Sequence, residues 1–435
     1  MARVLLHSLV FAPEANSTSY LMTDLARQLK RQGHEVTVLT TTPHNNLEAG
    51  ALARQPLRPV WPVWPGLLYR SELEGIRVWH VKLPMKGNRV LRRMLDYIRF
   101  HVVSLVAGPA LVGRYDIVLA PSPPLTIGVA GWMLSVWGRT PVVYNVQEIY
   151  PDFAINQGLI RNPAFIRLLQ RVEQFVYARS DRVVSISESF QRTIRARGVA
   201  AEQLMVIPNF VDTELYRPLP RHNEFSAQHG LDDDFVVLYG GNIGLSQDWE
   251  SLLFAAAAHA ELPIRYVIAG DGARRAWLEA EVVRRGLKNV QLLGYQPREL
   301  MPLINASSDI CTIPMKATTT QDTFPSKIYS ILASARPAVV SADPGSELEW
   351  VIGQAGCGRV VAPDDPRAYA DAVLRAFHER DQLAEDGARG RRFVEEEYSK
   401  EAVGRKYDLL IRELVGRSRG RQPVASLPQP EAGSG

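Results

Sequence analysis

The sequence is poor in cysteine, with only Cys311 and Cys357 in 435 residues. Two cysteines cannot build the disulfide framework of a small secreted protein. Each also lies beside a short apolar run where a small buried side chain fits. The scarcity of cysteine therefore favours a reducing compartment, and we expect a cytoplasmic protein.

The chain also lacks a convincing export signal. A single charge precedes the apolar run Val4–Val10, which is too short for a signal peptide and is better interpreted as a first strand. The uncharged run Ile117–Gly138 is long enough to span a membrane, but three prolines between positions 121 and 124 interrupt it. We predict a strand, a loop and a buried helix there instead.

Metal-ligand spacing is missing as well. His7, His34 and His80 are scattered singly, and the run 232–234 of three aspartates reads as a solvated turn before a strand. The net charge is only +4, and neither a basic stripe with interleaved aromatics nor a known nucleic-acid-binding module is present. We therefore expect no metal site and no nucleic-acid partner.

One segment concentrates positive charge between apolar residues. The pattern suits an amphipathic helix on an anionic membrane surface, here the inner membrane surface, although a solvated basic helix face would look the same. We predict membrane contact through Lys86–Phe100. The basic residues of the segment are Lys86, Arg89, Arg92, Arg93 and Arg99, and Lys82 lies just before it.

The length exceeds that of one ordinary core, so we expect two domains. Strand-like apolar runs alternate with helix-length segments, which predicts two doubly wound α/β domains with parallel sheets facing a cleft. Ile207–Pro220 contains three prolines and ends the first alternation. The predicted units are an N-terminal domain over 1–215, a second domain over 216–400, a helix over 401–416 that returns to the first domain, and a disordered tail over 417–435.

The clearest expected helix is Thr18–Gln32. The expected strands are Val4–Val10, Glu35–Thr40, Ile117–Ala120, Val142–Asn145 and Arg182–Ser185, followed in the second domain by Phe235–Tyr239, Ile264–Ala269, Val290–Leu293, Ile310–Ile313, Ala338–Ser341 and Arg359–Val361.

Two glycine-rich loops follow strands of the second domain. Glycines between a strand and a helix let the backbone approach a phosphate, whose charge the helix N-terminus favours. Ligands of such sheets bind at the carboxyl ends of the strands. Tight turns without a ligand and a solvated arginine are the alternatives. The residues predicted to bind a nucleotide are Gly241, Asn242 and Gln247 from the first loop and Gly270 and Arg274 from the second.

Lys327 is expected in the first turn of a helix that follows Phe324-Pro325-Ser326. Cations are disfavoured at a helix N-terminus, so this position is electrostatically costly. A bound diphosphate would offset the cost. Lys327 is therefore the strongest candidate for a phosphate ligand, against the alternative of a solvated surface lysine.

Several motifs occur together in a specific order: IPNFVDTELYRP from Ile207, YGGNIG from Tyr239, AGDG from Ala269 and FPSKIYSILASARP from Phe324. With FAPEANSTSY, APSPPLTIG and YNVQEIYPD in the first half, the chain resembles the family 4 glycosyltransferases of the GT-B fold. The resemblance extends to about Leu414 and is strongest to enzymes that build capsular, colanic-acid-like or O-antigen repeat units, including N-acetylfucosaminyl- and fucosyltransferases.

The resemblance implies a nucleotide-sugar donor held by the C-terminal domain, an acceptor held by the N-terminal domain, retention of anomeric configuration, and no metal or other cofactor. It places Gly241 and Asn242 at the donor phosphates, Lys327 on the diphosphate and Tyr295 near the base. Asp322 and Ser330 occupy the positions of two glutamates that are usual in the family. Asp322 can still serve the transferred sugar, whereas Ser330 brings no charge to the ribose.

In the first half, Glu148 follows a strand end and is expected to accept the proton of the acceptor hydroxyl. A helix cap or loop hydrogen bond is its alternative role. Glu14 and Asn16 are expected to bind the acceptor. The predicted function is transfer from a UDP- or GDP-sugar to a lipid-linked saccharide in bacterial surface polysaccharide synthesis; a non-catalytic donor-binding subunit and a sugar-nucleotide epimerase are the alternatives.

Overall fold

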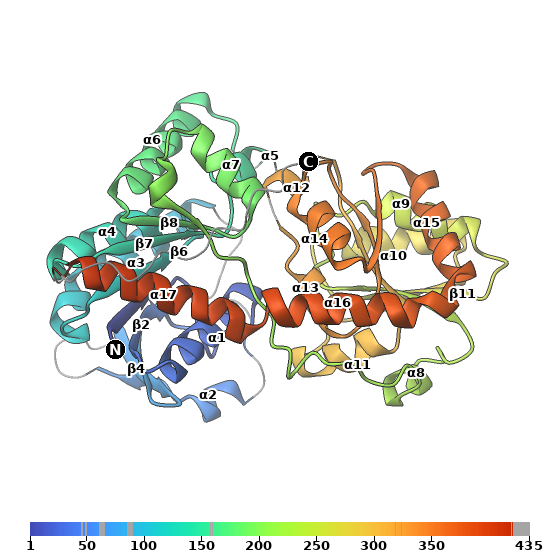
Figure 1. Cartoon of the computed structure of the whole chain (residues 1–435), viewed down its shortest axis with the longest axis horizontal. Coiled ribbons are helices and arrows are strands. Elements are labelled where there is room, and N and C mark those ends of the chain that lie inside the picture. Colours follow the sequence, from blue (N-terminus) through green and yellow to red (C-terminus); the bar gives the residue numbers. More distant parts are fainter. Residues whose placement is uncertain are drawn as a thin grey trace.

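The computed structural model describes residues 1–44, 47, 50–60, 66–84, 90–156, 158, 160–317, 319–322, 324–418 and 420. It contains two parallel-rich sheets, each covered by helices, which lie side by side along the long axis of the molecule (Figure 1). The predicted doubly wound α/β architecture is confirmed. Among the described residues, no helix is both long and apolar enough to cross a membrane.

The first sheet has the strand order β3-β4-β5-β2-β1-β6-β7-β8-β9. Helices cover both faces of its parallel central strands, so nearly all residues of these strands are buried and most of them are apolar. This is why the sequence revealed β1, β2, β6, β7 and β8. The strands are β1 Arg3–His7, β2 Glu35–Thr41, β3 Arg58–Pro59, β4 Leu68–Leu73, β5 Ile76–Val81, β6 Ile117–Pro121, β7 Val142–Val146, β8 Arg182–Ser185 and β9 Leu204–Val206.

One prediction about this sheet was wrong, and one hairpin was not predicted. The first strand ends at His7 rather than Val10, because the Ser8 hydroxyl donates to the Val10 carbonyl at 2.8 Å and the chain turns out of the sheet. The antiparallel hairpin of β4 and β5 was not predicted, because exposed residues are interspersed with buried or half-buried ones in LYRSEL and IRVWHV. Its turn places Glu74 and Gly75 at positive φ.

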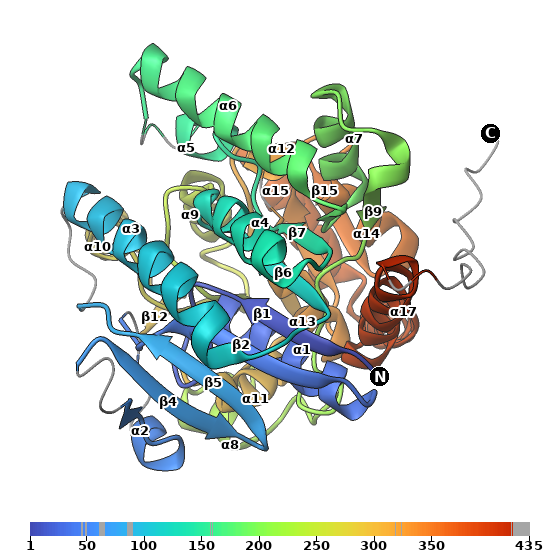
Figure 2. The same ribbon diagram turned by 90° about the vertical axis from the view of Figure 1, so that its left-hand side faces the viewer.

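The helices of the first domain are α1 Ser17–Arg31, α2 Ala51–Arg54, α3 Val90–Ala107, α4 Thr126–Gly138, α5 Asp152–Asn156, α6 Pro163–Arg179 and α7 Glu188–Ala196. The run 117–138 forms β6, a proline-containing loop and α4, as predicted. Helices α3, α4 and α6 lie next to one another on one outer face (Figure 2).

The second sheet has the order β12-β11-β10-β13-β14-β15, and all its strands run parallel. All six predicted strands are confirmed to within one residue: β10 Phe235–Gly240, β11 Ile264–Ala269, β12 Val290–Leu293, β13 Ile310–Pro314, β14 Ala338–Ser341 and β15 Gly358–Val361. The helices are α8 Glu224–Gln228, α9 Trp249–Ala258, α10 Arg275–Arg285, α11 Met301–Ala306, α12 Thr319–Asp322, α13 Lys327–Ala333, α14 Glu347–Ala355, α15 Pro366–His378 and α16 Leu383–Glu397.

The last helix, α17 Lys400–Ser418, leaves the second domain and packs on the first, against α1 (Figure 1). Asp408 lies 2.7 Å from His34 Nε2, and Glu413 pairs with Arg182 at 2.7 Å. Tyr407 accepts a hydrogen bond from the Asn145 side chain beneath the sheet. These partly buried contacts tie the end of the chain to the first domain.

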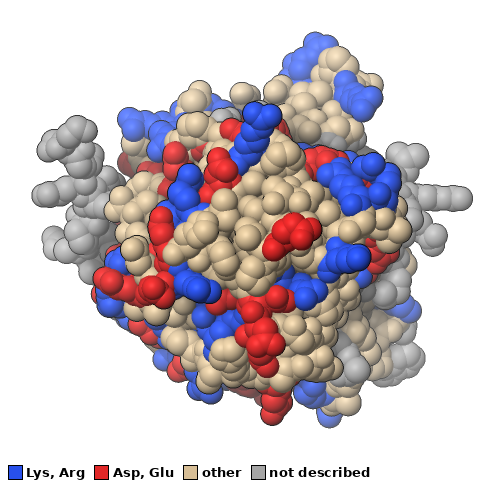
Figure 3. Space-filling view, turned by 90° about the vertical axis from the view of Figure 1, so that its right-hand side faces the viewer, with Lys and Arg blue, Asp and Glu red and all other residues tan. Residues whose placement is uncertain are grey.

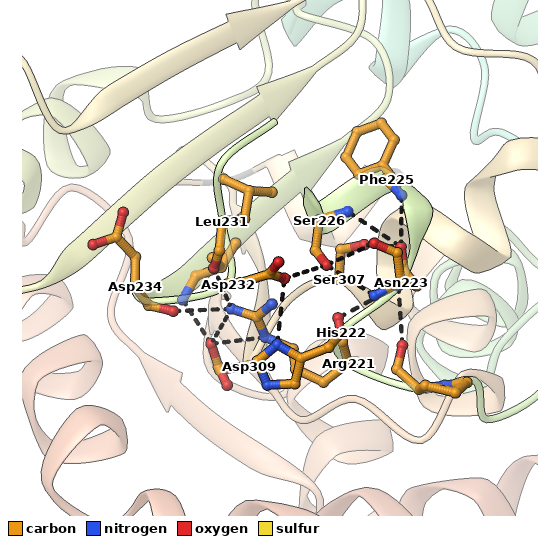
Figure 4. Close-up of polar contacts among 12 residues, drawn as sticks. Arg221, His222, Asn223, Phe225, Ser226, Leu231, Asp232, Asp234, Ser307 and Asp309 are labelled. Atoms are coloured by element: carbon orange, nitrogen blue, oxygen red, sulfur yellow. Dashed lines mark hydrogen bonds and ion pairs between the residues drawn. The ribbon is translucent and has the colours of Figure 1, made fainter. Parts of the chain in front are cut away.

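Two of the three aspartates at 232–234, Asp232 and Asp234, belong to a polar network at the start of the second domain (Figure 4). Asp232 accepts from the Ser226 hydroxyl at 2.5 Å, and Asp234 pairs with Arg265 at 2.8 Å. Arg221 bridges the carbonyls of Leu231 and Asp234 to the Asp309 carboxylate. The network attaches the segment that enters this domain to the amino-terminal edge of its sheet.

On the outer face of the second domain, Lys and Arg are interspersed with Asp and Glu wherever the face is described (Figure 3). Arg285, for example, pairs with both Glu250 and Glu281. Because the two signs alternate there, this face has no single-sign field to attract a charged surface.

Candidate active site

The two glycine loops of the second domain pack against each other as one unit. The amide of Gly241 donates to Ala269 O at 2.9 Å, and that of Ile243 donates to Asp271 O at 2.8 Å. Gly270 has φ +157°, and a Cβ there would lie 1.8 Å from the Gly241 carbonyl oxygen. Only glycine permits this approach, so the two predicted phosphate loops form a single backbone surface at the carboxyl ends of β10 and β11.

Lys327 extends from the first turn of α13 toward this surface. Its ammonium lies 4.0 Å from the centre of the Tyr239 ring, and a Cβ on Gly241 would be 2.7 Å from it. No carboxylate of the described residues pairs with it. Burial without a counter-charge lowers the pKa of Lys327 to about 7. The lysine thus provides a cation that lacks an anion, directly beside two glycine loops.

Facing these loops, a cavity of about 540 Å³ opens where four strands of the first sheet end. Loops after β1, β2, β6 and β7 supply Asn16, His44, Pro123 and Glu148, and α3 adds two side chains. Asn242, from the first glycine loop, completes the wall. The cavity therefore joins the carboxyl edges of both sheets, where ligands of such folds bind. Its lining is Leu9, Val10, Asn16, Ser17, Thr18, His44, Leu83, Pro84, Asp96, Tyr97, Pro123, Glu148 and Asn242.

Glu148 brings a carboxyl group into the cavity. It forms no hydrogen bond or ion pair with any described residue, and burial raises its pKa to about 7. A carboxyl group with such a pKa exchanges protons near neutral pH, as a general acid or base requires.

Glu14 and Asn16 have different positions although both were predicted as acceptor ligands. Asn16 lines the cavity and caps α1, its side-chain oxygen accepting from Ser19 N at 2.9 Å. Glu14 lies behind the wall with its side chain 1% exposed. It accepts from Asn16 Nδ2 at 2.8 Å and from His44 N at 3.2 Å. Glu14 thus supports two residues that reach the cavity.

Two family models match the chain along most of its length: the glycosyl transferase 4-like domain over residues 19–209 and the glycosyl transferases group 1 over residues 234–379. The chain is a GT-B glycosyltransferase. The match to the first model covers the domain that carries Glu148, and the match to the second covers both glycine loops and Lys327.

This glycosyltransferase is similar to several named proteins. It is 25% identical to the putative colanic acid biosynthesis glycosyl transferase WcaI of Escherichia coli (strain K12) over 93% of this chain and 98% of the relative. The probable glycosyltransferase WbjE of Pseudomonas aeruginosa is 23% identical over 76% and 83%. Among solved structures, Anabaena HepE in complex with UDP has a TM-score of 0.70 at 16% identity, covering 94% of this chain and 99% of that one.

Other predicted donor residues lie in the same region with different contacts. Gln247 is buried and its side-chain oxygen accepts from Gly244 N at 2.9 Å, so it holds the first loop from inside. Arg274 stacks on Trp277 at 4.9 Å. Its neighbour Arg275 donates to Gly270 O at 2.7 Å and fixes the second loop.

Three further positions complete the predicted set. Tyr295 is exposed after β12, at the same sheet edge. The Ser330 hydroxyl donates to Lys327 O at 2.8 Å, within α13. Asp322 ends α12, and its side chain lies outside the described part of the structure.

The sequence did not single out His44, Asp96 or Tyr97, although all three line the cavity. A signal for His44 existed, because it follows the end of β2 by three residues and strand ends of one parallel sheet converge. Asp96 and Tyr97 belong to helix α3 and do not follow the end of a strand, so the sequence contained no comparable signal for them.

Proposed function

We propose that this glycosyltransferase moves a sugar from a UDP- or GDP-linked donor to a lipid-linked saccharide during the synthesis of a bacterial surface polysaccharide, with retention of configuration and without a metal. The observation that carries the proposal is the ammonium of Lys327, which lies beside the joined glycine loops and pairs with no carboxylate of the described residues. A nucleoside diphosphate supplies the missing anion, and the loop amides add hydrogen bonds.

The reaction would begin when donor binding closes the cleft and excludes water. As the bond to the diphosphate breaks, negative charge grows on the leaving oxygen, where Lys327 and the loop amides stabilise it. The acceptor hydroxyl attacks from the face that the diphosphate leaves, and Glu148 receives its proton. The pKa of about 7 suits that transfer, because the carboxylate form is populated at neutral pH.

The relatives support a polysaccharide substrate. WcaI is described as a colanic acid biosynthesis enzyme, and the similarity covers nearly all of both chains. The HepE structure is a complex with UDP, which supports a nucleoside diphosphate as a ligand of this chain as well. We therefore expect the acceptor to be a growing saccharide rather than a free monosaccharide.

A membrane-bound acceptor is supported by the outer face of α3. Leu95, Ile98, Val102 and Val106 follow helical spacing and are 66%, 56%, 54% and 51% exposed. Part of the predicted contact segment lies outside the described structure, namely Lys86, Arg89 and the side chains of Arg92 and Arg93. Of its described residues, Arg99 is half-buried and Phe100 is buried in the core. The contact surface that we propose thus continues beyond Phe100.

Neighbouring helices extend this face. Helix α4 exposes Val136 and Trp137, and α6 exposes Arg167 and Arg171. The only acidic residue of α6, Glu173, is buried, so the described surface of α6 is basic as well as apolar. Such a surface suits anionic lipid headgroups, and α3 also forms a wall of the cavity through Asp96 and Tyr97. A lipid-linked acceptor can therefore reach the cavity from the membrane.

The deciding experiment is a donor screen followed by a transfer assay. UDP- and GDP-sugars, with UDP-N-acetylfucosamine and GDP-fucose among them, are tested by thermal shift, and each stabilising donor is then incubated with a polyprenyl-diphosphate-linked saccharide and followed by mass spectrometry. EDTA should leave transfer unchanged, and the product should keep the anomeric configuration. Stabilisation without transfer to any acceptor would instead favour a non-catalytic binding subunit, and no stabilisation by any nucleotide would refute the donor site.

A further inference from the structure

Glu14 and His44 form a buried pair in the wall of the cavity. His44 Nδ1 lies 3.2 Å from Glu14 Oε2, and the two side chains are 8% and 1% exposed. The residues come from the loops after β2 and β1, which are neighbouring strands of the sheet. His44 lines the cavity, whereas Glu14 does not.

The neighbours of His44 Nδ1 determine where its hydrogen lies. Besides the carboxylate, Nδ1 faces Thr42 O at 3.2 Å and Thr41 Oγ1 at 3.0 Å. The Thr41 hydroxyl donates its own hydrogen to Leu9 O at 2.8 Å, so it presents a lone pair to the ring. All three neighbours are thus acceptors, and Nδ1 must carry a hydrogen. In the neutral ring Nε2 is then an acceptor.

Nε2 of His44 has no partner among the described residues, which sets it apart from two other buried histidines. His80 uses both nitrogens, Nδ1 toward Thr41 O at 2.9 Å and Nε2 toward Ser71 Oγ at 2.8 Å. His34 likewise accepts from Ala2 N at 3.2 Å and contacts Asp408 at 2.7 Å. Those rings connect parts of the fold, whereas His44 lines the cavity and keeps one nitrogen without a partner among the described residues.

We propose that His44 is a further substrate-binding residue, whose Nε2 accepts a hydrogen bond from a sugar hydroxyl in the cavity, and that Glu14 is a positioning residue that fixes the ring and its tautomer. The proposal rests on the proposed glycosyl transfer and adds a site of hydroxyl recognition to it. The hydroxyl belongs either to the acceptor or to the transferred sugar, because the cavity lies between the two domains. A polar site built to bind a hydroxyl discriminates against ligands that lack it.

The test uses His44→Ala and His44→Gln in the full-length enzyme, with His34→Gln as a matched control, since His34 is also buried and paired with a carboxylate but lies away from the cavity. Loss of one neutral hydrogen bond should raise the KM of the sugar-bearing substrate by about five- to tenfold in His44→Ala, with kcat changed by about twofold or less. His44→Gln, whose side-chain oxygen can accept, should recover part of that loss. Binding of bare UDP or GDP should stay unchanged.

The two sources of the hydroxyl give different results. A higher KM for the acceptor alone assigns the contact to the acceptor, and a higher KM for the donor with unchanged nucleoside diphosphate affinity assigns it to the transferred sugar. The proposal is overturned if neither KM rises, or if His34→Gln raises the same KM as much as His44→Ala does.

A second measurement separates this proposal from the function on which it rests. In ¹H–¹⁵N long-range spectra of the wild type, the His44 ring should show a hydrogen on Nδ1 and none on Nε2, and its Nε2 signal should shift when the stabilising nucleotide-sugar or the saccharide acceptor is added. Glu14→Gln should weaken the preference for that tautomer. A wild type that transfers no sugar refutes the proposed function, and an Nε2 signal that neither ligand moves refutes the role of His44.

Discussion

Replacing Lys327 by methionine tests the donor site most directly, because it removes the charge and keeps most of the volume. The Lys327 ammonium has only the Tyr239 ring, at 4.0 Å, as a favourable partner in the described structure. A hydrogen bond between an ammonium and a phosphate contributes about 1.5–3 kcal/mol. We therefore expect Lys327→Met to weaken UDP or GDP binding by about 10- to 150-fold.

The pH dependence sharpens this prediction. Because the pKa of Lys327 in the free protein is lowered to about 7, binding at higher pH must first restore the proton. The wild-type Kd should then rise by about tenfold per pH unit above 7, until the pKa of the lysine in the complex is reached. In Lys327→Met the Kd should not depend on pH in this range.

In the ligand-free protein, the stability of the fold should rise with pH, whereas nucleotide affinity should fall. A lysine whose folded pKa lies below its unfolded value binds fewer protons when folded, between about pH 7 and 10.5. The contribution of Lys327 therefore makes the free energy of unfolding rise with pH across that window, and below pH 7 its destabilising effect is complete. Lys327→Met should be more stable than wild type at pH 7 and should lose this part of the slope.

Isothermal titration with UDP and GDP between pH 6.5 and 9, together with denaturant unfolding, measures both effects. Lys288→Met, which removes an exposed lysine of the same domain, is the control and should behave like the wild type. A Lys327→Met protein that keeps the wild-type Kd and pH slope would refute the assignment of Lys327 to the diphosphate.

Three further predictions follow from the site. Glu148→Gln should lower kcat by about 100-fold or more, while calorimetry should show that nucleotide binding is retained. The wild type should lose activity as pH falls through about 7, and this loss should be absent in the variant. An unchanged kcat would show that Glu148 does not accept the proton. Gly270→Ala should destabilise the fold by about 3 kcal/mol and abolish UDP or GDP binding, because the added Cβ would overlap Gly241 O. The control is Gly353→Ala, at an open helical position, which should leave the melting temperature nearly unchanged. The double change Leu95→Ser and Val102→Ser should reduce cosedimentation with phosphatidylglycerol vesicles several-fold and leave transfer to a water-soluble acceptor unaffected; equal cosedimentation would refute α3 as the membrane contact.

The sequence predicted those strands whose burial is uniform. In β1, Val4, Leu5 and Leu6 are all buried although they point to alternate faces, so the run is apolar throughout and stands out from its surroundings. Strands β4 and β5 lie toward the sheet edge, where one face meets solvent, and their alternating polarity matched no uniform run. In the first sheet, alternating strands were therefore missed for the same reason that central strands were found. Strands β12 and β15, at the edges of the second sheet, were predicted because their burial does not alternate.

For the site, proximity to a strand end was the informative signal. Glu148, Asn16 and Asn242 all follow strand ends, and all three line the cavity. What a residue does there depends on the direction of its side chain, which a sequence pattern does not contain. Gln247 shares a loop with Asn242 but points inward to Gly244, and Glu14 supports the wall instead of forming it.

The two halves of the cavity belong to different domains, so their separation depends on the contacts that hold the domains in register. Helix α1 has a central part in this, because Asn16 at its N-terminus lines the cavity while Asp24, further along, pairs with Arg298 of the second domain at 3.0 Å. Arg298 also lies 4.5 Å from the centre of the Tyr20 ring on the same helix. On its other side α1 packs against α17, which continues from the second domain. If donor binding closes the cleft as we propose, α1 would carry Asn16 with it, and we expect closure to shift this wall of the cavity.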